Sequence, residues 1–153
     1  LNTVLDLNPN MQGEVLDFGC GLGVIGSVLK TFYKDVKVDM LDVNSVAVEL
    51  SKENCTLNNV SQNNVFLSDL YNNVDKKYTH IVTNPPIKVG KKILFGVVSG
   101  ASEHLTTGGD ITLVIRKSHG EESMKKHMEE VFGNCEILKR DKGYYILKST
   151  KKD

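Results

Sequence analysis

Short clusters of apolar residues alternate along the chain with longer segments in which apolar residues recur every three or four positions. The short clusters predict strands and the longer segments predict helices, because side chains repeat every two positions along a strand and every ~3.6 along a helix. Strands are predicted at 15–18, 36–42, 63–67, 78–83 and 111–115. Helices are predicted at 24–32, 46–57, 91–105 and 123–132.

Residues at the ends of these segments sharpen their boundaries. Ser45 is predicted to cap the second helix, Gly108-Gly109 to stop the third and Gly133 to end the fourth. Two closing strands are predicted to form a hairpin, with bounds 136–138 and 144–147 and a turn at Asp141-Lys142-Gly143.

The alternation of the first five strands with helices predicts a doubly wound α/β sheet of the Rossmann-like type, with parallel strands and helices on both faces. Ligands of such sheets bind beyond the carboxyl ends of the strands. The candidate site residues are therefore those that follow each strand, at 17–23, 42, 69 and 84–87.

Composition narrows the class of protein. The 153 residues are 40% hydrophobic and 25% charged, which is typical of one globular domain. No apolar run reaches the ~18 residues of a membrane-spanning helix, so we expect no membrane partner. Three cysteines, at 20, 55 and 135, fit neither a disulfide framework nor a cysteine-based zinc site. We therefore expect no metal and a reducing compartment, the cytoplasm or an organelle.

Charge is unevenly distributed along a chain whose net charge is zero. Residues 1–83 hold 6 basic and 10 acidic side chains, whereas residues 84–153 hold 13 basic and 9 acidic ones. The basic half could face a polyanion such as RNA. A solvated surface with a chance imbalance remains the alternative.

A glycine-rich loop follows the first strand in the sequence DFGCGLGVIG, residues 17–26. Gly21, Gly23 and Gly26 satisfy the G-x-G-x-x-G pattern of dinucleotide sites, and Asp42 follows Gly21 by 21 residues, as a ribose-binding acid does. Asp17, however, would repel a pyrophosphate and favour an ammonium group. The D-x-G-x-G-x-G pattern thus favours S-adenosylmethionine, whose methionine end carries such a group.

Two more acidic residues end the next strands. The Asp42 carboxylate can accept hydrogen bonds from both ribose hydroxyls. Asp69 can accept one from the adenine amino group, with Leu70 against the ring. The alternative for both aspartates is a structural role in a turn or helix cap.

The sequence Asn84-Pro85-Pro86-Ile87 follows the fourth strand. The prolines fix the backbone and remove two donors, so the Pro85 carbonyl and the Asn84 side-chain oxygen are both acceptors. Together they can hold a planar amino group with its lone pair directed at an electrophilic methyl, which is catalysis by positioning. A plain Pro-Pro turn is the alternative.

These residues resemble the class I S-adenosylmethionine-dependent methyltransferases, and specifically the methyltransferase small-domain family with its RsmC-like 16S ribosomal RNA guanine-N2 enzymes. The resemblance covers residues 15–147. It is carried by 15–26, Asp42, Asp69, 84–92, Leu105-x-x-Gly108-Gly109, Phe132-Gly133-Asn134 and Lys142-Gly143-Tyr144-Tyr145.

The resemblance implies a seven-stranded sheet, mostly parallel with an antiparallel last strand, and S-adenosyl-L-methionine as cofactor. Gly19, Gly21 and Gly23 would wrap its methionine end, with Asp17 near the amino group. Asp42 would hold the ribose and Asp69 the adenine. The rest of the implied cofactor-binding set is Cys20, Val43, Leu70 and Asn84. The implied catalytic set is Asn84, Pro85, Pro86 and Ile87.

Two departures from relatives refine this expectation. Ile87 stands where many amino-methylating relatives carry Tyr or Phe, which can stack on a flipped base. Ile87 in place of an aromatic residue disfavours the adenine-N6 methyltransferases and the release-factor glutamine methyltransferases, and it fits the guanine-N2 methyltransferases better. Relatives also carry a segment before the glycine-rich loop that helps to close the cofactor site, whereas only 14 residues precede Val15 here. We therefore expect residues 1–153 to form a single domain that is truncated at its N-terminus and binds the cofactor less tightly.

The leading hypothesis is methyl transfer to guanine N2 of small-subunit ribosomal RNA, with that RNA or the small ribosomal subunit as partner. The candidate RNA contacts are Lys88, Lys91, Lys92, Arg116 and Lys117, with a solvated surface as the alternative. Tyr144 and Tyr145 are expected to pack rather than to stack on bases. The other hypotheses are a protein-glutamine or small-molecule methyltransferase, an NAD-dependent oxidoreductase and a non-catalytic RNA-binding module.

Overall fold

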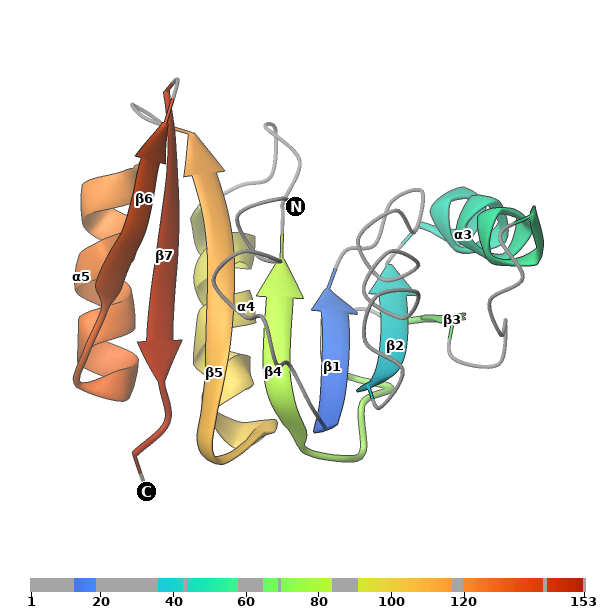
Figure 1. The fold of residues 1–153 in the computed structure, drawn as a ribbon, viewed down its shortest axis with the longest axis horizontal. Helices are drawn as coiled ribbons and strands as arrows, with labels where there is room; N and C mark the ends of the chain where they lie inside the picture. Colours follow the sequence, from blue (N-terminus) through green and yellow to red (C-terminus); the bar gives the residue numbers. More distant parts are fainter. Residues whose placement is uncertain are drawn as a thin grey trace.

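Seven strands among the described residues form one sheet in the order β3-β2-β1-β4-β5-β7-β6 (Figure 1). The structure is a computed structural model and describes residues 13–18, 36–42, 44–57, 65–68, 70–83, 91–116, 120–141 and 143–152. The strands are β1 (Gly13–Phe18), β2 (Val36–Asp42), β3 (Val65–Leu67), β4 (Tyr78–Thr83), β5 (Leu105–Arg116), β6 (Glu136–Asp141) and β7 (Tyr144–Thr150). The helices are α3 (Ser45–Leu57), α4 (Lys91–Glu103) and α5 (Glu121–Phe132).

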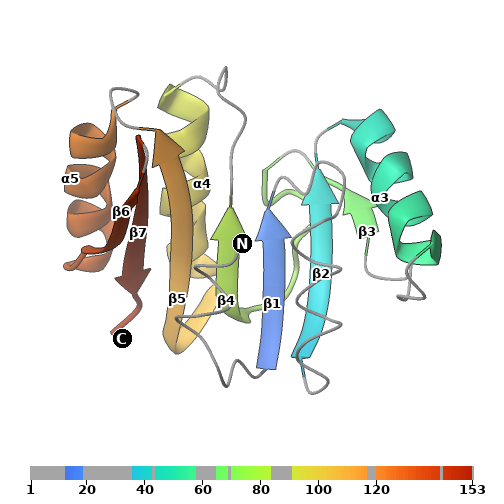
Figure 2. The same ribbon diagram turned by 45° about the horizontal axis from the view of Figure 1, so that its top comes forward.

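The strand directions confirm the predicted sheet. Every neighbouring pair from β3 to β5 is parallel, and β7 lies antiparallel between β5 and β6. The crossovers β2-α3-β3 and β4-α4-β5 run in opposite directions along the sheet. Because parallel crossovers are right-handed, they place α3 and α4 on opposite faces. Figures 1 and 2 show α4 and α5 side by side behind one half of the sheet. Helix α3 lies at the other end of the sheet, beside β2 and β3.

Both faces of the sheet are buried, as expected for a doubly wound fold. Successive residues of a strand face opposite sides, so each strand contributes to two apolar layers. The larger layer packs under α4 and α5 and includes Leu16, Phe18, Ile81, Ile111, Leu113, Val97, Val98, Met124 and Met128. Buried residues that alternate with these, or come from α3, include Val15, Val38, Met40, Val48, Val65 and Val82.

The largest difference from the predicted elements lies at Gly108-Gly109. The third predicted helix ends at Glu103, and both glycines lie inside β5 instead of stopping that helix. The register explains why. Tyr78 pairs with Leu105 but His80 pairs with Asp110, so β5 bulges between these pairs. A Cβ on Gly109 would lie 2.9 Å from two backbone carbonyl oxygens, so this close approach requires glycine.

Helix ends follow the predictions in part. Gly133 ends α5 with a left-handed φ of 79°, as predicted. The cap of α3 is Asn44 rather than Ser45, because Asn44 Oδ1 accepts hydrogen bonds from the backbone N–H groups of Val46 at 2.8 Å and Ala47 at 3.4 Å. The closing hairpin is confirmed, with longer strands than predicted. The predicted helix at 24–32 lies outside the described residues.

Candidate functional site at the carboxyl edge of the sheet

The register brings the ends of four parallel strands to one edge of the sheet. Phe18 of β1 pairs with Leu41 of β2 and with Thr83 of β4, and Asp42 pairs with Leu67 of β3. Asp17 therefore lies one residue before this edge and Asp42 directly at it, on neighbouring strands. The structure thus brings together two of the predicted cofactor-binding carboxylates.

Asp17 is a buried acidic residue. Only 1% of it is exposed, and it alternates with Leu16 and Phe18, so it faces the side of the sheet opposite α4 and α5. Burying a carboxylate is unfavourable unless hydrogen bonds or an opposite charge stabilise it. Full burial of an aspartate is rare in proteins, which makes Asp17 a candidate functional residue.

Asp42 is held by the turn that joins β2 to α3. Its Oδ1 accepts a hydrogen bond from the backbone N–H of Asn44 at 3.0 Å. Asn44 in turn caps α3 through its own side chain. Two successive side-chain-to-backbone bonds therefore fix the direction in which the half-buried Asp42 carboxylate points.

The segment after β3 is tied to the same edge. The backbone N–H of Ser68 donates to the carbonyl of Asp42 at 2.9 Å, and Ser68 Oγ donates to the carbonyl of Leu70 at 2.7 Å. Leu70 has a left-handed φ of 51°, which is uncommon for a branched residue. Its half-buried side chain packs against the core below α4. Only the remaining part of that side chain is available to a ligand.

Most of the predicted site residues lie outside the described residues. They are Gly19, Cys20, Gly21, Gly23, Val43, Asp69, Asn84, Pro85, Pro86, Ile87, Lys88 and Lys117. The residues that directly precede three of these segments, Phe18, Ser68 and Thr83, all lie at the carboxyl edge. Of the other candidate RNA contacts, Lys91 is the first residue of α4, and Lys92 is exposed.

Arg116 is the last residue of β5, so it lies at the same carboxyl edge of the sheet, and it is exposed. Its Nε donates to the hydroxyl of Tyr144 at 3.3 Å, and its guanidinium carbon lies 5.5 Å from the centre of the Tyr144 ring. The expectation that both tyrosines pack is confirmed for Tyr145, which packs against the core, and only in part for Tyr144, which contacts Arg116 but is 41% exposed. The K-G-Y-Y sequence alone does not reveal which tyrosine faces outward.

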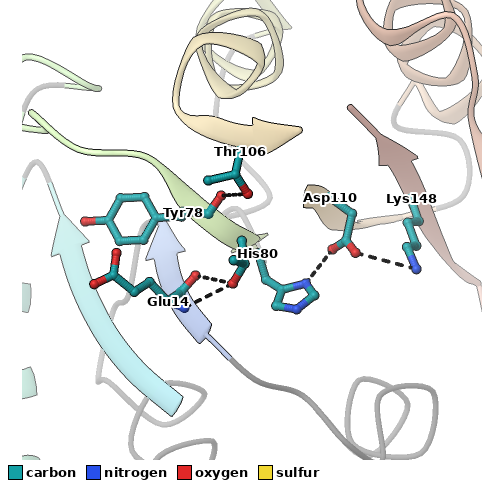
Figure 3. Close-up of polar contacts among 7 residues, drawn as sticks. Glu14, Tyr78, His80, Thr106, Asp110 and Lys148 are labelled. Carbon is teal, nitrogen blue, oxygen red and sulfur yellow. Dashed lines mark hydrogen bonds and ion pairs between the residues drawn. The ribbon is translucent and has the colours of Figure 1, made fainter. Parts of the chain in front are cut away.

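A second polar cluster lies toward the amino-terminal ends of β1 and β4, away from this edge (Figure 3). Asp110 lies at its centre on β5: Oδ1 is 3.0 Å from Nδ1 of His80 on β4, and Oδ2 is 3.6 Å from Nζ of Lys148 on β7. The three side chains join three adjacent strands. Sequence analysis missed them, because nothing local signals a contact between residues 30 or more positions apart.

The amino-terminal cluster continues to β1 and β2. The buried Tyr78 hydroxyl donates to Asp39 Oδ2 at 2.6 Å, and Lys76 lies 3.0 Å from the same oxygen. Burial, followed by the hydrogen bond to Asp39, raises the pKa of Tyr78 well above its ordinary value. Thr79 Oγ1 bonds both the backbone N–H and the carbonyl of Glu14. These contacts hold strands together and show no geometry for catalysis.

No group of three or more His, Cys, Asp or Glu side chains within the described ranges could hold a metal ion. None of the helices that the structure describes is long and apolar enough to cross a membrane.

Comparison with known proteins identifies the class that this fold and edge belong to. The sequence profile of the methyltransferase small domain matches residues 2–148. The chain therefore belongs to the methyltransferase small-domain family. This confirms the predicted S-adenosylmethionine-dependent methyltransferase fold and its cofactor at the level of the family.

Particular relatives are similar over nearly the whole chain. The uncharacterized protein YbxB of Bacillus subtilis (strain 168) is 41% identical over 145 residues, which are 94% of this chain and 72% of YbxB. Ribosomal RNA small subunit methyltransferase C of Aliivibrio fischeri (strain ATCC 700601 / ES114) is 35% identical over 152 residues, 97% of this chain and 44% of that protein. The chain therefore spans less than half of that methyltransferase.

A solved structure shows the same fold. The Thermus thermophilus 16S rRNA N2 G1207 methyltransferase (RsmC), in complex with AdoMet and guanosine, superposes with a TM-score of 0.82 at 22% sequence identity. The match covers 99% of this chain and 41% of that enzyme.

Proposed function

We propose that this chain transfers a methyl group from S-adenosylmethionine to the exocyclic N2 amino group of guanine in small-subunit ribosomal RNA. The observation that carries the proposal is the register at the carboxyl edge. It aligns Asp17, Asp42 and the end of β4, after which Asn84-Pro85-Pro86-Ile87 follows. The similarity to ribosomal RNA small subunit methyltransferase C supports the choice of substrate.

The acidic residues at this edge fit the cofactor chemically. The buried Asp17 carboxylate suits the ammonium of its methionine end, and the oriented Asp42 carboxylate suits a pair of ribose hydroxyls. The remaining proposed contacts are Gly19, Cys20, Gly21, Gly23, Val43, Asp69, Leu70 and Asn84. The bound cofactor supplies an electrophilic methyl group on a sulfonium.

The target amine is proposed to bind Asn84 and the Pro85 carbonyl. Both accept hydrogen bonds from the amino group, so its lone pair is directed toward the methyl without a strong base. Pro86 rigidifies the segment and Ile87 offers an apolar face to the guanine. Lys88, Lys91, Lys92, Arg116 and Lys117 are proposed to contact RNA phosphates.

The proposed partner is ribosomal RNA or the assembled small subunit. An enzyme with this substrate works where ribosomes are assembled, which fits the predicted cytoplasmic location. We also propose that residues 1–153 act as one catalytic domain.

The test is methyl transfer from labelled S-adenosylmethionine to small ribosomal subunits that lack the modification. RNA and protein are separated, and the RNA is digested to nucleosides for mass spectrometry. We expect label in N2-methylguanosine. The Asn84→Ala variant should lose about 100-fold in rate, because the amine is misplaced, while calorimetry shows that it still binds S-adenosylhomocysteine, with a loss of affinity much smaller than the loss in rate. Asn72→Ala, at an exposed position in the turn after β3, is the matched control and should keep full activity.

Other outcomes contradict parts of the proposal. Label in protein or in a different nucleoside overturns the substrate and favours the protein or small-molecule hypothesis. Normal transfer by Asn84→Ala overturns the mechanism. Binding of NAD without S-adenosylhomocysteine would favour an oxidoreductase.

A further inference from the structure

The two arginines of the chain, Arg116 and Arg140, have the same kind of neighbour. Arg116 lies over Tyr144, and the Arg140 guanidinium carbon lies 5.6 Å from the centre of the Tyr145 ring. Within the described part of the chain neither forms an ion pair with a carboxylate, whereas Lys76, Lys125 and Lys148 all do. Among the described side chains, these two positive charges therefore have no acidic partner.

The end of the β6–β7 hairpin that holds Arg140, Tyr144 and Tyr145 is adjacent to the candidate site. Thr83, which directly precedes Asn84, pairs with Leu113 on β5, and Arg116 lies three residues further along the same strand. Arg116 pairs across the ladder with Tyr144, the first residue of β7. Figures 1 and 2 show the end of β5 and the start of β7 together at the edge to which β4 and β1 point.

Arg116 and Tyr144 share one face of the sheet. Directly opposite residues of an antiparallel pair project to the same side, so these two side chains face away from α5. Their neighbours Ile115 and Tyr145 face the core beneath α4 and α5. Arg116 and Tyr144 are exposed, so part of an aromatic ring and a guanidinium group are presented together.

This pair has the chemistry of a nucleotide contact. An aromatic face stacks on any base, and a guanidinium that lies over the ring still has donors for a phosphate oxygen. The hydrogen bond from Arg116 Nε to the Tyr144 hydroxyl orients the guanidinium before a ligand binds. A cation with no acidic partner among the described residues, beside an exposed ring, offers a positive charge for a phosphate and an aromatic surface for a base.

We propose that Arg116 and Tyr144 bind a nucleotide that flanks the methylated guanine in single-stranded RNA. The inference rests on the proposed function and deepens it. The base stacks on Tyr144 while Arg116 contacts its phosphate, so both are positioning residues rather than catalytic ones. Arg140, at the same end of the hairpin, adds a second positive charge on the opposite face.

The first experiment measures binding of a fluorescein-labelled single-stranded oligoribonucleotide of mixed sequence to the full chain by fluorescence anisotropy. Tyr144→Ala should weaken binding about tenfold through the lost stacking, and Tyr144→Phe less than twofold because the ring remains. Arg116→Ala should also weaken binding about tenfold and lower the slope of log affinity against log salt by about one. Lys126→Ala, which removes an exposed charge from α5, should change the affinity less than twofold.

Two controls make the result decisive. Each variant should keep the melting temperature and the S-adenosylhomocysteine affinity of the unmodified chain. The inference is overturned if the unmodified chain does not bind the oligonucleotide, if Tyr144→Ala and Tyr144→Phe bind alike, or if Lys126→Ala weakens binding as much as Arg116→Ala.

Methyl transfer to small ribosomal subunits separates this inference from the proposed function. Tyr144→Ala should raise KM for the subunit about tenfold with little change in kcat, as expected of a positioning residue. Normal KM with normal methylation overturns the inference alone. Weakened RNA binding by the variant, in a chain that methylates no ribosomal RNA, supports the nucleotide contact and overturns the proposed function.

Discussion

At the amino-terminal ends of the strands, polar side chains contact one another across strands: Asp110 pairs with His80 and Lys148, and Tyr78 pairs with Asp39. At the carboxyl edge, Asp42 is held instead by the backbone N–H of a residue two positions away. Contacts of the first kind join distant parts of the chain and stabilise the sheet. The second kind is local, so it orients a carboxylate and adds little to strand pairing.

This difference separates residues whose contacts stabilise the sheet from residues that are proposed to bind a ligand. Buried polar groups that satisfy one another are costly to disrupt, because each partner is left unpaired. A carboxylate fixed by a turn can change with little effect on folding. Substitutions in the two regions should therefore affect different measurements.

Of the substitutions that test this difference, Asp42→Asn has the largest expected effect, which is on cofactor affinity. Asparagine keeps an Oδ1 that accepts the Asn44 N–H but removes the charge that strengthens hydrogen bonds to ribose hydroxyls. The dissociation constant for S-adenosylhomocysteine should rise about 30-fold, equivalent to ~2 kcal/mol. Calorimetry measures the affinity, and urea unfolding should show a stability change below ~0.5 kcal/mol. An unchanged affinity would remove Asp42 from the cofactor site.

Asp110→Asn should lower the stability of the chain and leave its cofactor affinity nearly unchanged. The amide cannot balance the charge of Lys148, and its Nδ2 group offers a donor where an acceptor stood. Because Asp110 is buried whereas His80 and Lys148 are partly exposed, we expect a loss of about 1.5 kcal/mol in the free energy of unfolding. Cofactor affinity should stay within twofold. A large loss of affinity without a loss of stability would contradict the assignment of this cluster to folding.

The sequence predicts the carboxyl edge better than the amino-terminal cluster for a physical reason. The bounds of β2 and β4 are as predicted, since apolar clusters and flanking turns are local signals. Parallel strands then bring their ends to one edge whatever the register in detail. The sequence therefore correctly places Asp17 and Asp42 at the ends of neighbouring strands, while their contacts with the cofactor stay predictions. The glycine loop and Asn84 stay predictions.

The wrong predictions have two causes. Some features depend on residues far away in the sequence, and others on a choice between neighbouring residues that suit the same position equally well. Gly108-Gly109 after a helical pattern is typical of a helix end, and only the pairing of β4 with β5 turns it into a bulge. Asn44 and Ser45 are both good caps, so propensity does not choose between them. The exposure of Tyr144 follows from which face of β7 packs under α5, which the local pattern Tyr-Tyr does not state.

The smallest effect that sharpens the comparison is alkaline destabilisation through Tyr78. Its raised pKa means that the folded chain keeps a proton that the unfolded chain releases near pH 10, so stability falls as pH rises above that value. Between pH 9 and 10.5 Tyr78 should contribute a loss of about 0.8 kcal/mol. Burial opposes the charge of Lys76, but Asp39 and Glu14 outweigh it and raise its pKa, so Lys76 acts in the same direction. The comparison of Tyr78→Phe with the unmodified chain, by urea unfolding at both pH values, isolates the tyrosine. If both chains lost the same free energy of unfolding between pH 9 and 10.5, the Tyr78 hydroxyl would ionise as readily in the folded chain as in the unfolded one.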